Sequence, residues 1–409
     1  MFAKETGLDL EMGIAVVDRL IDIDELWHAA ARKLRVRSDP PQDVYVDGLR
    51  CLASALGQAG RYDADASRLL QREIFSRILS DLKLTGDLAC FSELNDVPVH
   101  RPLLVAGFGR TGSTLLHNLL ALDPNARAPL LWEIWNPSPP PRPETRLSDP
   151  RIEIAQRRLD AFTSVDPSIL KIHPMSARAP DECHWMMRHS PQICMLYEVP
   201  EYWLWLKQLS DGKLEELYAH YRLQVKYLQL FCRRRHWVSK AMAHAHFMPV
   251  LFNVFPDARI VRLHRDPCDA VPSLCSLFAG YRSLFSSRVN RDEIGSTILD
   301  MFVDHMKRAI AVPADKANQV IDIHFDDLVA NPISTVRHIY RQLDYPYGAA
   351  FEREVVRHLD SERAATKPRH IYSLEQFGLS RATVIGRSAE YLQWVGQLFG
   401  GRVESAWGR

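Results

Sequence analysis

The stretch from Arg101 to Leu122 constrains the fold more than any other part of the sequence. It begins with the short apolar run Leu103–Ala106, which is typical of a fully buried strand. Several glycines follow at once, and leucines at helical spacing come after them. The stretch therefore predicts a strand, a tight turn and a helix. Such a turn directs backbone N–H groups and a helix N-terminus at an anion, so it indicates a phosphate-binding site.

The spacing within this turn is that of a P-loop without its lysine. Gly107 and Gly112 are separated as in the pattern GxxxxGK[ST], but Ser113 stands at the lysine position. In a nucleoside triphosphatase that lysine reaches the β- and γ-phosphates. Hydroxyls and one cation supply the remaining polar groups of the loop: Thr111, Ser113, Thr114 and Arg110. We therefore expect a phosphate-bearing donor other than a nucleoside triphosphate.

Length and composition exclude several classes of protein. A chain of 409 residues with 46% hydrophobic and 25% charged residues is typical of a soluble protein of two or three domains. The net charge of +1 gives no reason to expect nucleic acid or an anionic membrane as a partner. The first residues lack the pattern of a signal peptide, and no apolar run is long enough to span a membrane.

The cysteines and histidines favour a cytoplasmic protein without a bound metal. The 7 cysteines are odd in number and include no CxxC pair, so we expect reduced thiols and a cytoplasmic location. His244 with His246, and Cys183 with His184 and His189, have no second ligand pair at zinc spacing. We therefore expect no metal.

The remaining chain predicts a helical region followed by an α/β domain. Residues 1–98 have helical periodicity, and packing, a lid over the substrate and a contact within a homodimer are roles that fit them. From 99 to 409, helices alternate with further strand candidates: His236–Lys240, Ala258–His264 and Val320–Phe325. This alternation predicts a parallel sheet flanked by helices, with ligands at the carboxyl ends of the strands.

Three features together resemble the sulfotransferases that use 3′-phosphoadenosine 5′-phosphosulfate (PAPS). They are the loop without lysine, Lys240 at the end of its strand, and Arg265 with Ser273 eight residues later. The resemblance spans about Arg101 to Arg387 and is closest to the bacterial branch, with GFGRTGST, WVSK, FPDARIVRLHRDP and HIYSLEQFGL in this order. The donor site also resembles that of the tyrosylprotein sulfotransferases.

The resemblance implies a role for each matching residue. The 5′-phosphosulfate is expected on Arg110, Thr111, Gly112, Ser113 and Thr114, and the 3′-phosphate on Arg265 and Ser273. Lys240 is expected to stabilise charge on the bridging oxygen, with Arg110 helping to replace Mg²⁺. The basic residues Lys367 and Arg369 are expected to close over the donor. Phe325 stands where the family often has tyrosine, so the hydrogen bond of that hydroxyl is lost.

Three residues are candidates for the base that takes the proton of the acceptor hydroxyl. Glu133 follows the helix after the loop, as does the glutamate base of the tyrosylprotein sulfotransferases. The cytosolic enzymes have a histidine base where this chain has Met242, and His244 lies two residues further on; His173 is the third candidate. A carboxylate base is expected to be buried against a tryptophan, which would raise its pKa toward neutrality.

The aromatic and sulfur-containing residues indicate the kind of acceptor. Tryptophans and methionines between Trp132 and Trp205 indicate a small hydroxyl compound that is apolar or amphipathic, although the same residues could form core.

Two other functions are alternatives to sulfuryl transfer. One alternative is a P-loop kinase, against which Ser113 argues. The other is a non-catalytic nucleotide-binding assembly protein, against which the presence of Arg265, Ser273 and Lys240 argues.

Overall fold

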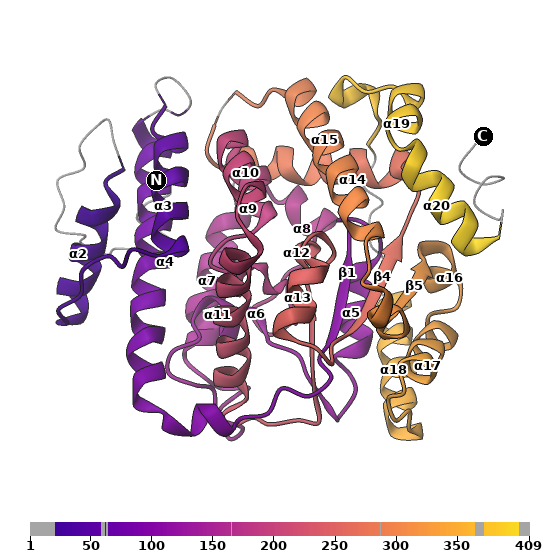
Figure 1. Ribbon diagram of the computed structural model, residues 1–409, viewed down its shortest axis with the longest axis horizontal. Coiled ribbons are helices and arrows are strands. Elements are labelled where there is room, and N and C mark those ends of the chain that lie inside the picture. Colours follow the sequence, from indigo (N-terminus) through magenta and orange to yellow (C-terminus); the bar gives the residue numbers. More distant parts are fainter. Residues whose placement is uncertain are drawn as a thin grey trace.

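The computed structural model describes residues 21–58, 62, 64–164, 166–286, 288–364 and 372–400. The N-terminal helices lie at one end of the molecule, and the sheet lies toward the other with helices on both sides (Figure 1). The N-terminal elements are α2 (Ile23–Leu34), α3 (Val44–Leu56), α4 (Ala64–Cys90) and the short helix η1 (Ser92–Asp96).

A five-stranded parallel sheet positions the glycine-rich turn. Its strands are β1 (Leu103–Gly107), β2 (Ala126–Arg127), β3 (His236–Lys240), β4 (Arg259–His264) and β5 (Val320–His324). Their order is β2-β3-β1-β4-β5, so β1 is central, with Val105 opposite Lys240 and Gly107 opposite Leu263. Because the strands are parallel, β1, β3 and β4 end at the same edge of the sheet.

Alternate side chains of β1 enter two different cores, as expected of a strand buried on both faces. Leu103 and Val105 pack against one set of helices: α5 (Ser113–Leu120), α16 (Phe325–Ala330), α17 (Pro332–Gln342) and α18 (Ala349–Ala364). Leu104 and Ala106 enter the larger core, to which the opposite set contributes: α11 (Asp211–Gln229), α12 (Met242–His246), α13 (Met248–Val254), α14 (Pro267–Arg282) and α15 (Arg291–Ile310).

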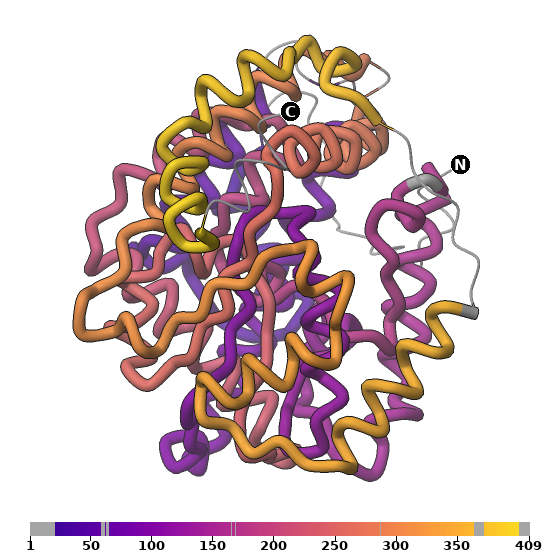
Figure 2. Tube along the Cα trace, turned by 90° about the vertical axis from the view of Figure 1, so that its right-hand side faces the viewer, coloured from indigo at the N-terminus to yellow at the C-terminus, as the bar shows by residue number. Residues whose placement is uncertain are grey.

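The other elements surround this framework. Seven of them join the strands or cover the cavity described below: α6 (Leu131–Trp135), α7 (Arg151–Ser164), α8 (Ser168–Ile172), η2 (Cys183–Met186), α9 (Pro191–Tyr197), α10 (Pro200–Lys207) and η3 (Ala314–Gln319). The last are η4 (Glu375–Phe377), α19 (Arg381–Arg387) and α20 (Ala389–Phe399). Figure 2 shows α19 and α20 in yellow at the opposite side of the molecule from α17 and α18.

The predicted α/β class is confirmed, and the strand candidates differ from the observed strands by at most one residue at either end. The N-terminal helices share a core with the α/β part, because Trp27, Leu49 and Phe75 belong to the same cluster as Leu104. The domain boundary at residue 98 stays a prediction. Among the described residues, every helix is too short or too polar to cross a membrane.

Candidate active site

The loop after β1 is held in a conformation that its glycines make accessible. Gly107 has a φ of +124°, and a Cβ there would lie 2.8 Å from the carbonyl oxygen of Leu263. Gly112 has a φ of +88°, and a Cβ there would lie 3.0 Å from the ring of Phe325. Larger residues at these two positions would therefore strain the backbone or displace a neighbour.

The loop also places a charged side chain in an unusual backbone conformation. Arg110 has a φ of 69°, although it is not glycine. The Thr111 hydroxyl donates to the carbonyl oxygen of Phe108 over 2.8 Å and fixes the turn. Since α5 begins at Ser113, the first backbone N–H groups of that helix lie at the loop and have no partner within the helix itself. This combination of N–H groups and cation is suited to an anion.

The arginine and serine from β4 and α14 lie against this loop. Asp266 caps α14 by accepting from the Cys268 N–H over 2.7 Å, and this places Arg265 just before the helix. Arg265 Nη1 donates to the carbonyl oxygen of Arg110 over 2.9 Å. Arg110 Nε in turn donates to the Ser273 hydroxyl over 3.1 Å. Two segments that are far apart in the sequence thus form one cluster.

The charges of this cluster are arranged for an anionic ligand. Burial lowers the pKa of the Arg110 guanidinium, and the nearby positive charge of Arg265 lowers it further. The guanidinium of Arg265 stacks on Phe325 at 4.3 Å, and its nearest acid is the largely exposed Asp269 at 3.6 Å. Arg265 Nε is buried without a hydrogen-bond partner among the described residues. The residues present therefore fit a phosphate group, which would satisfy that N–H and the two adjacent cations.

Lys240 connects this cluster to a large cavity. At the end of β3, its Nζ lies 3.2 Å from the Thr114 hydroxyl and 2.9 Å from Glu182 Oε1. Burial alone would raise the pKa of Glu182, but the charge of Lys240, with smaller effects of His184 and His173, lowers this pKa to about 2. Lys240 and Glu182 are therefore an ion pair at the boundary between the loop and the cavity.

Comparison with known proteins shows to which family this chain belongs. Residues 102–349 match the model described as "Sulfotransferase family". The chain belongs to this family. The family assignment favours the sulfotransferase hypothesis over the kinase and assembly-protein alternatives. Ser113 at the lysine position already argued against the kinase.

Individual sulfotransferases are similar over different parts of the chain. The ω-hydroxy-β-dihydromenaquinone-9 sulfotransferases Stf3 of Mycobacterium bovis and Mycobacterium tuberculosis are each 26% identical over 59% of this chain. The matched part spans 62% of the length of these curated relatives. Among solved structures, sulfotransferase STF1 of M. tuberculosis covers 91% of this chain and all of its own, with 25% identity and a TM-score of 0.80. STF9 of Mycobacterium avium has a TM-score of 0.78 at 23% identity, covering 92% of this chain and 97% of its own.

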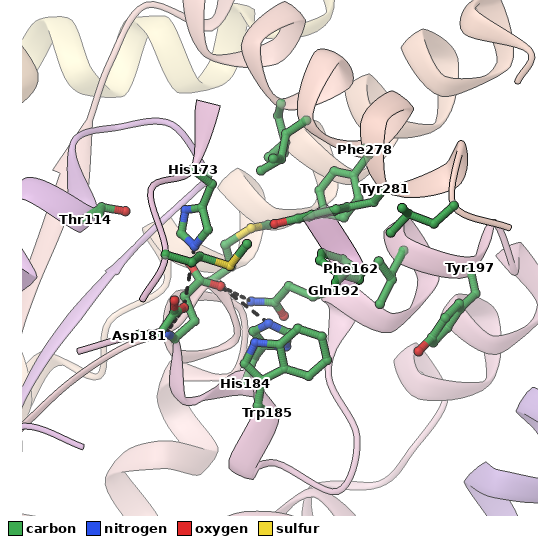
Figure 3. Close-up of a pocket in the computed structure, with 18 of the residues that line it drawn as sticks. Thr114, Phe162, His173, Asp181, His184, Trp185, Gln192, Tyr197, Phe278 and Tyr281 are labelled. Atoms are coloured by element: carbon green, nitrogen blue, oxygen red, sulfur yellow. Dashed lines mark hydrogen bonds and ion pairs between the residues drawn. The ribbon is translucent and has the colours of Figure 1, made fainter. Parts of the chain in front are cut away.

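The cavity begins at the loop after β1, where Gly109, Arg110, Ser113 and Thr114 line it together with Lys240, and the rest of its wall is mainly apolar. It contains about 1250 Å³ of empty space, open solvent at its mouth included. Its aromatic wall comes from α6, α7, η2, α9, α14 and the residues after α14: Trp135, Phe162, Trp185, Tyr197, Phe278, Tyr281 and Phe285. Figure 3 shows several of these rings around the same space. A wall of this kind is typical of a site for a small organic molecule.

The prediction that aromatic residues between Trp132 and Trp205 line the acceptor site is only partly right. Trp135 and Trp185 line the cavity, whereas Trp132 and Tyr202 are fully buried in the core. Both kinds of residue have the same local sequence character. The distinction comes from the packing of η2 against α6 and of α9 against α14, which the sequence does not reveal.

Glu133 lies outside this cavity, and the expectation that its pKa is raised is wrong. The side chain is fully buried, and each of its oxygens accepts from Arg127 over 2.9 Å. Arg146 adds a contact of 3.0 Å, and Glu133 also accepts from the Leu130 N–H. Burial alone would raise its pKa, but these two arginines lower it below the ordinary value. The geometry is that of a structural ion pair.

His244 is likewise separated from the cavity wall. It is fully buried, with Nε2 3.1 Å from the Cys183 sulfur and Nδ1 3.4 Å from the Tyr218 hydroxyl. Burial lowers its pKa to about 3. A proton on this ring would therefore be strongly unfavourable in the folded protein.

His173 is the candidate base that the structure places in the cavity. Its Nε2 lies 3.5 Å from Asp181 Oδ1, and both residues line the cavity wall, as Figure 3 shows. Burial would raise the pKa of Asp181, but His173 and, more weakly, Lys240 lower it. A carboxylate beside one ring nitrogen is an arrangement that fixes the orientation of a histidine ring.

Sequence reasoning missed the two adjacent acids of this cluster, Asp181 and Glu182. A signal was present, because two consecutive carboxylates follow Pro180 within a stretch otherwise rich in tryptophan and methionine. Their positions depend on the antiparallel bridge between Leu130 and Pro180, which joins α6 to the segment before η2. Such a long-range contact has no local pattern.

Two further predictions stay untested: the role of Lys367 and Arg369, and a reaction without a metal. Lys367 and Arg369 lie outside the described residues. Among the residues described, no group of three or more histidine, cysteine or acidic side chains is arranged to hold a metal ion. The expectation that the reaction needs no metal stays a prediction.

Proposed function

We propose that this protein transfers a sulfuryl group from PAPS to a hydroxyl of a small apolar or amphipathic compound. The observation that carries the proposal is the position of Lys240 between the Thr114 hydroxyl of the anion-binding loop and Glu182 of the apolar cavity. A cation at this boundary can neutralise charge that develops as a group leaves the donor for the acceptor.

The donor would lie along the cluster of the loop and α14. The 5′ end is assigned to Arg110, Thr111, Gly112, Ser113 and Thr114, and the 3′-phosphate to Arg265 and Ser273. When bound, PAPS supplies an activated sulfuryl group. The loop N–H groups and the cations bind its anionic groups and hold them in place, which is the main contribution a protein makes to an in-line transfer. The contact between Arg110 and Ser273 supports this arrangement.

We assign the general base to His173, in place of Glu133 and His244. A base must reach the hydroxyl from which it takes the proton, and of these three residues only His173 lines the cavity. Asp181 would hold the ring in the tautomer whose other nitrogen faces the acceptor. Lys240, released from Glu182 as the donor's charge approaches, would stabilise the leaving oxygen.

The acceptor class follows from the cavity. Aromatic and aliphatic side chains form most of its wall, so an apolar body is favoured and the hydroxyl would lie among Lys240, His173 and Glu182. Stf3, a relative at 26% identity, is named for a hydroxylated dihydromenaquinone. This name supports a quinone-like or lipid-like alcohol as the kind of acceptor to test first.

A screen of hydroxylated acceptors with radiolabelled PAPS tests the proposed function. We expect label to pass to apolar phenols or long-chain alcohols, and Lys240→Met to reduce this transfer strongly because the leaving oxygen loses its cation. Lys83→Met, which changes an exposed lysine of α4, is the matched control. Transfer to no acceptor, or undiminished transfer by Lys240→Met, would contradict the proposal.

A further inference from the structure

A second cavity lies directly behind the wall of the first. It contains about 670 Å³ of empty space, open solvent included, and is lined by α4 together with residues of α6, α7, η2 and the segment after η2. Ser76, Arg77 and Ser80 of α4 line it and are partly exposed, so the cavity reaches the surface along this helix. Nothing in the proposed transfer reaction uses it.

The two cavities are separated by side chains that line both. These are Glu73, Trp135, Arg158 and Trp185. Arg158 Nη2 donates to Glu73 Oε2 over 2.8 Å, and its guanidinium lies 4.8 Å from the centre of the Trp135 ring. Trp135 and Trp185 meet edge to face at 6.1 Å. Four different elements, α4, α6, α7 and η2, supply these side chains, so a ligand that spans both cavities must displace some of them.

The ion pair that closes this wall is within reach of solvent. The side chains of Arg158 and Glu73 are 25% and 17% exposed. Arg77, above the Trp185 ring at 5.7 Å, offers a second guanidinium on the side of the second cavity. A ligand that supplies its own anionic group could therefore replace Glu73 as the partner of these arginines.

The second cavity differs from the first in chemistry. Its wall carries three guanidiniums, two carboxylates, two serine hydroxyls and one amide: Arg77, Arg158, Arg188, Glu73, Asp81, Ser76, Ser80 and Gln224. Asp81 is already engaged by Arg188, with two contacts of 3.0 Å. The charges of the lining therefore favour an anionic, hydrogen-bonding group, whereas the first cavity favours an apolar body.

We propose that the acceptor is a two-ended molecule, with its hydroxyl at Lys240, its apolar body in the first cavity and an anionic far end, such as a carboxylate, in the second. This inference rests on the proposed function for the hydroxyl end and adds a specificity site formed by α4. The N-terminal helical region thereby has a role in choosing the acceptor.

Calorimetric binding of two matched compounds tests this site. The probes are a long-chain ω-hydroxy fatty acid and the primary alcohol of the same chain length, titrated into the full chain. Ser76→Trp and Ser80→Trp fill the second cavity from two positions, so that one result remains if the other variant fails to fold. Thr85→Trp adds the same ring at an exposed position of α4 and is the matched control.

We expect the wild-type protein and Thr85→Trp to bind the hydroxy acid about tenfold more tightly than the alcohol, as one charge-assisted contact provides. In Ser76→Trp and Ser80→Trp the two dissociation constants should become nearly equal. Equal affinities in the wild type, or a preference that survives in a folded tryptophan variant, would overturn the proposal. Failure of the transfer reaction itself appears in the labelled-PAPS screen and leaves this binding result intact.

Discussion

Lys240 and His173 lie in the same cavity wall but are held by different partners. Lys240 is fixed by the Thr114 hydroxyl and by Glu182, and His173 by Asp181. Glu133 is buried with two arginines, and their charges outweigh its loss of hydration. Glu182 and Glu133 carry the same carboxylate group, but the cations around each of them give it a different role.

Comparing His173→Gln with Glu133→Gln distinguishes a general base from a residue of a structural ion pair. We expect turnover to fall about 10²-fold or more, because the acceptor proton loses its receiving group, while PAPS affinity stays unchanged. Glu133→Gln should instead lower the free energy of unfolding by about 3 kcal/mol, because two buried arginines lose their counter-charge, with the effect on turnover much smaller. Steady-state kinetics and urea unfolding of both variants give the comparison. Near-normal turnover by folded His173→Gln would remove its assigned role.

At the scale of elements, the turn between β1 and α5 is the most demanding feature. Its backbone departs from ordinary conformations at Gly107, Arg110 and Gly112. The left-handed value at Gly112 and the nearby Phe325 ring leave little room for a side chain. The anion-binding N–H groups depend on this geometry.

Replacing Gly112 by alanine tests that dependence. We expect Gly112→Ala to destabilise the fold by about 1–2 kcal/mol and to weaken PAPS binding, because a Cβ is unfavourable at its φ of +88°. Gly86→Ala is the matched control on α4, where a Cβ would meet nothing within 4 Å, and alanine should be neutral or stabilising there. Thermal unfolding and calorimetry measure both effects. Unchanged donor affinity in Gly112→Ala would contradict the role of the loop.

Elements with a strong local pattern could be predicted from the sequence. The four longer strands are short segments with apolar residues that end near a glycine or a helix start, so β3 has the predicted bounds and β4 differs by one residue. The contact of Arg265 with the Arg110 carbonyl could be anticipated only through the order of motifs. The two-residue strand β2 and the position of Glu182 beside Lys240 depend on tertiary contacts, and no local pattern indicates them.

At the scale of the whole molecule, many histidines are buried. Burial lowers the pKa of His117, His189, His220, His244 and His305 to about 3, and that of His184 and His236 to about 4. These rings are neutral in the folded protein and bind protons once it unfolds. A histidine whose pKa is depressed by folding makes its full contribution to the free energy of unfolding above its unfolded pKa of about 6.5. That contribution is lost as the pH falls from this value toward the pKa of the folded state.

We therefore predict that the free energy of unfolding decreases steeply between pH values of about 6.5 and 4, with several protons bound on unfolding. Urea unfolding across this range measures the slope. His246→Phe should reduce the slope by about one proton, since burial also depresses the pKa of His246 and both of its ring nitrogens lack a partner among the described residues. His100→Gln, at an exposed position, should leave the slope unchanged. A flat profile down to pH 4 would contradict this account.

A calorimetric titration of adenosine 3′,5′-bisphosphate, compared with ATP, into the wild type and Arg265→Ala tests the proposed donor site. We expect tight binding of the bisphosphate and much weaker binding of ATP. Arg265→Ala should cost about 2–4 kcal/mol of the bisphosphate affinity, because a charge-assisted contact is lost, whereas Arg357→Ala, at an exposed position of α18, should cost nothing. Equal affinity for ATP, or an unchanged affinity in Arg265→Ala, would contradict the proposed donor site.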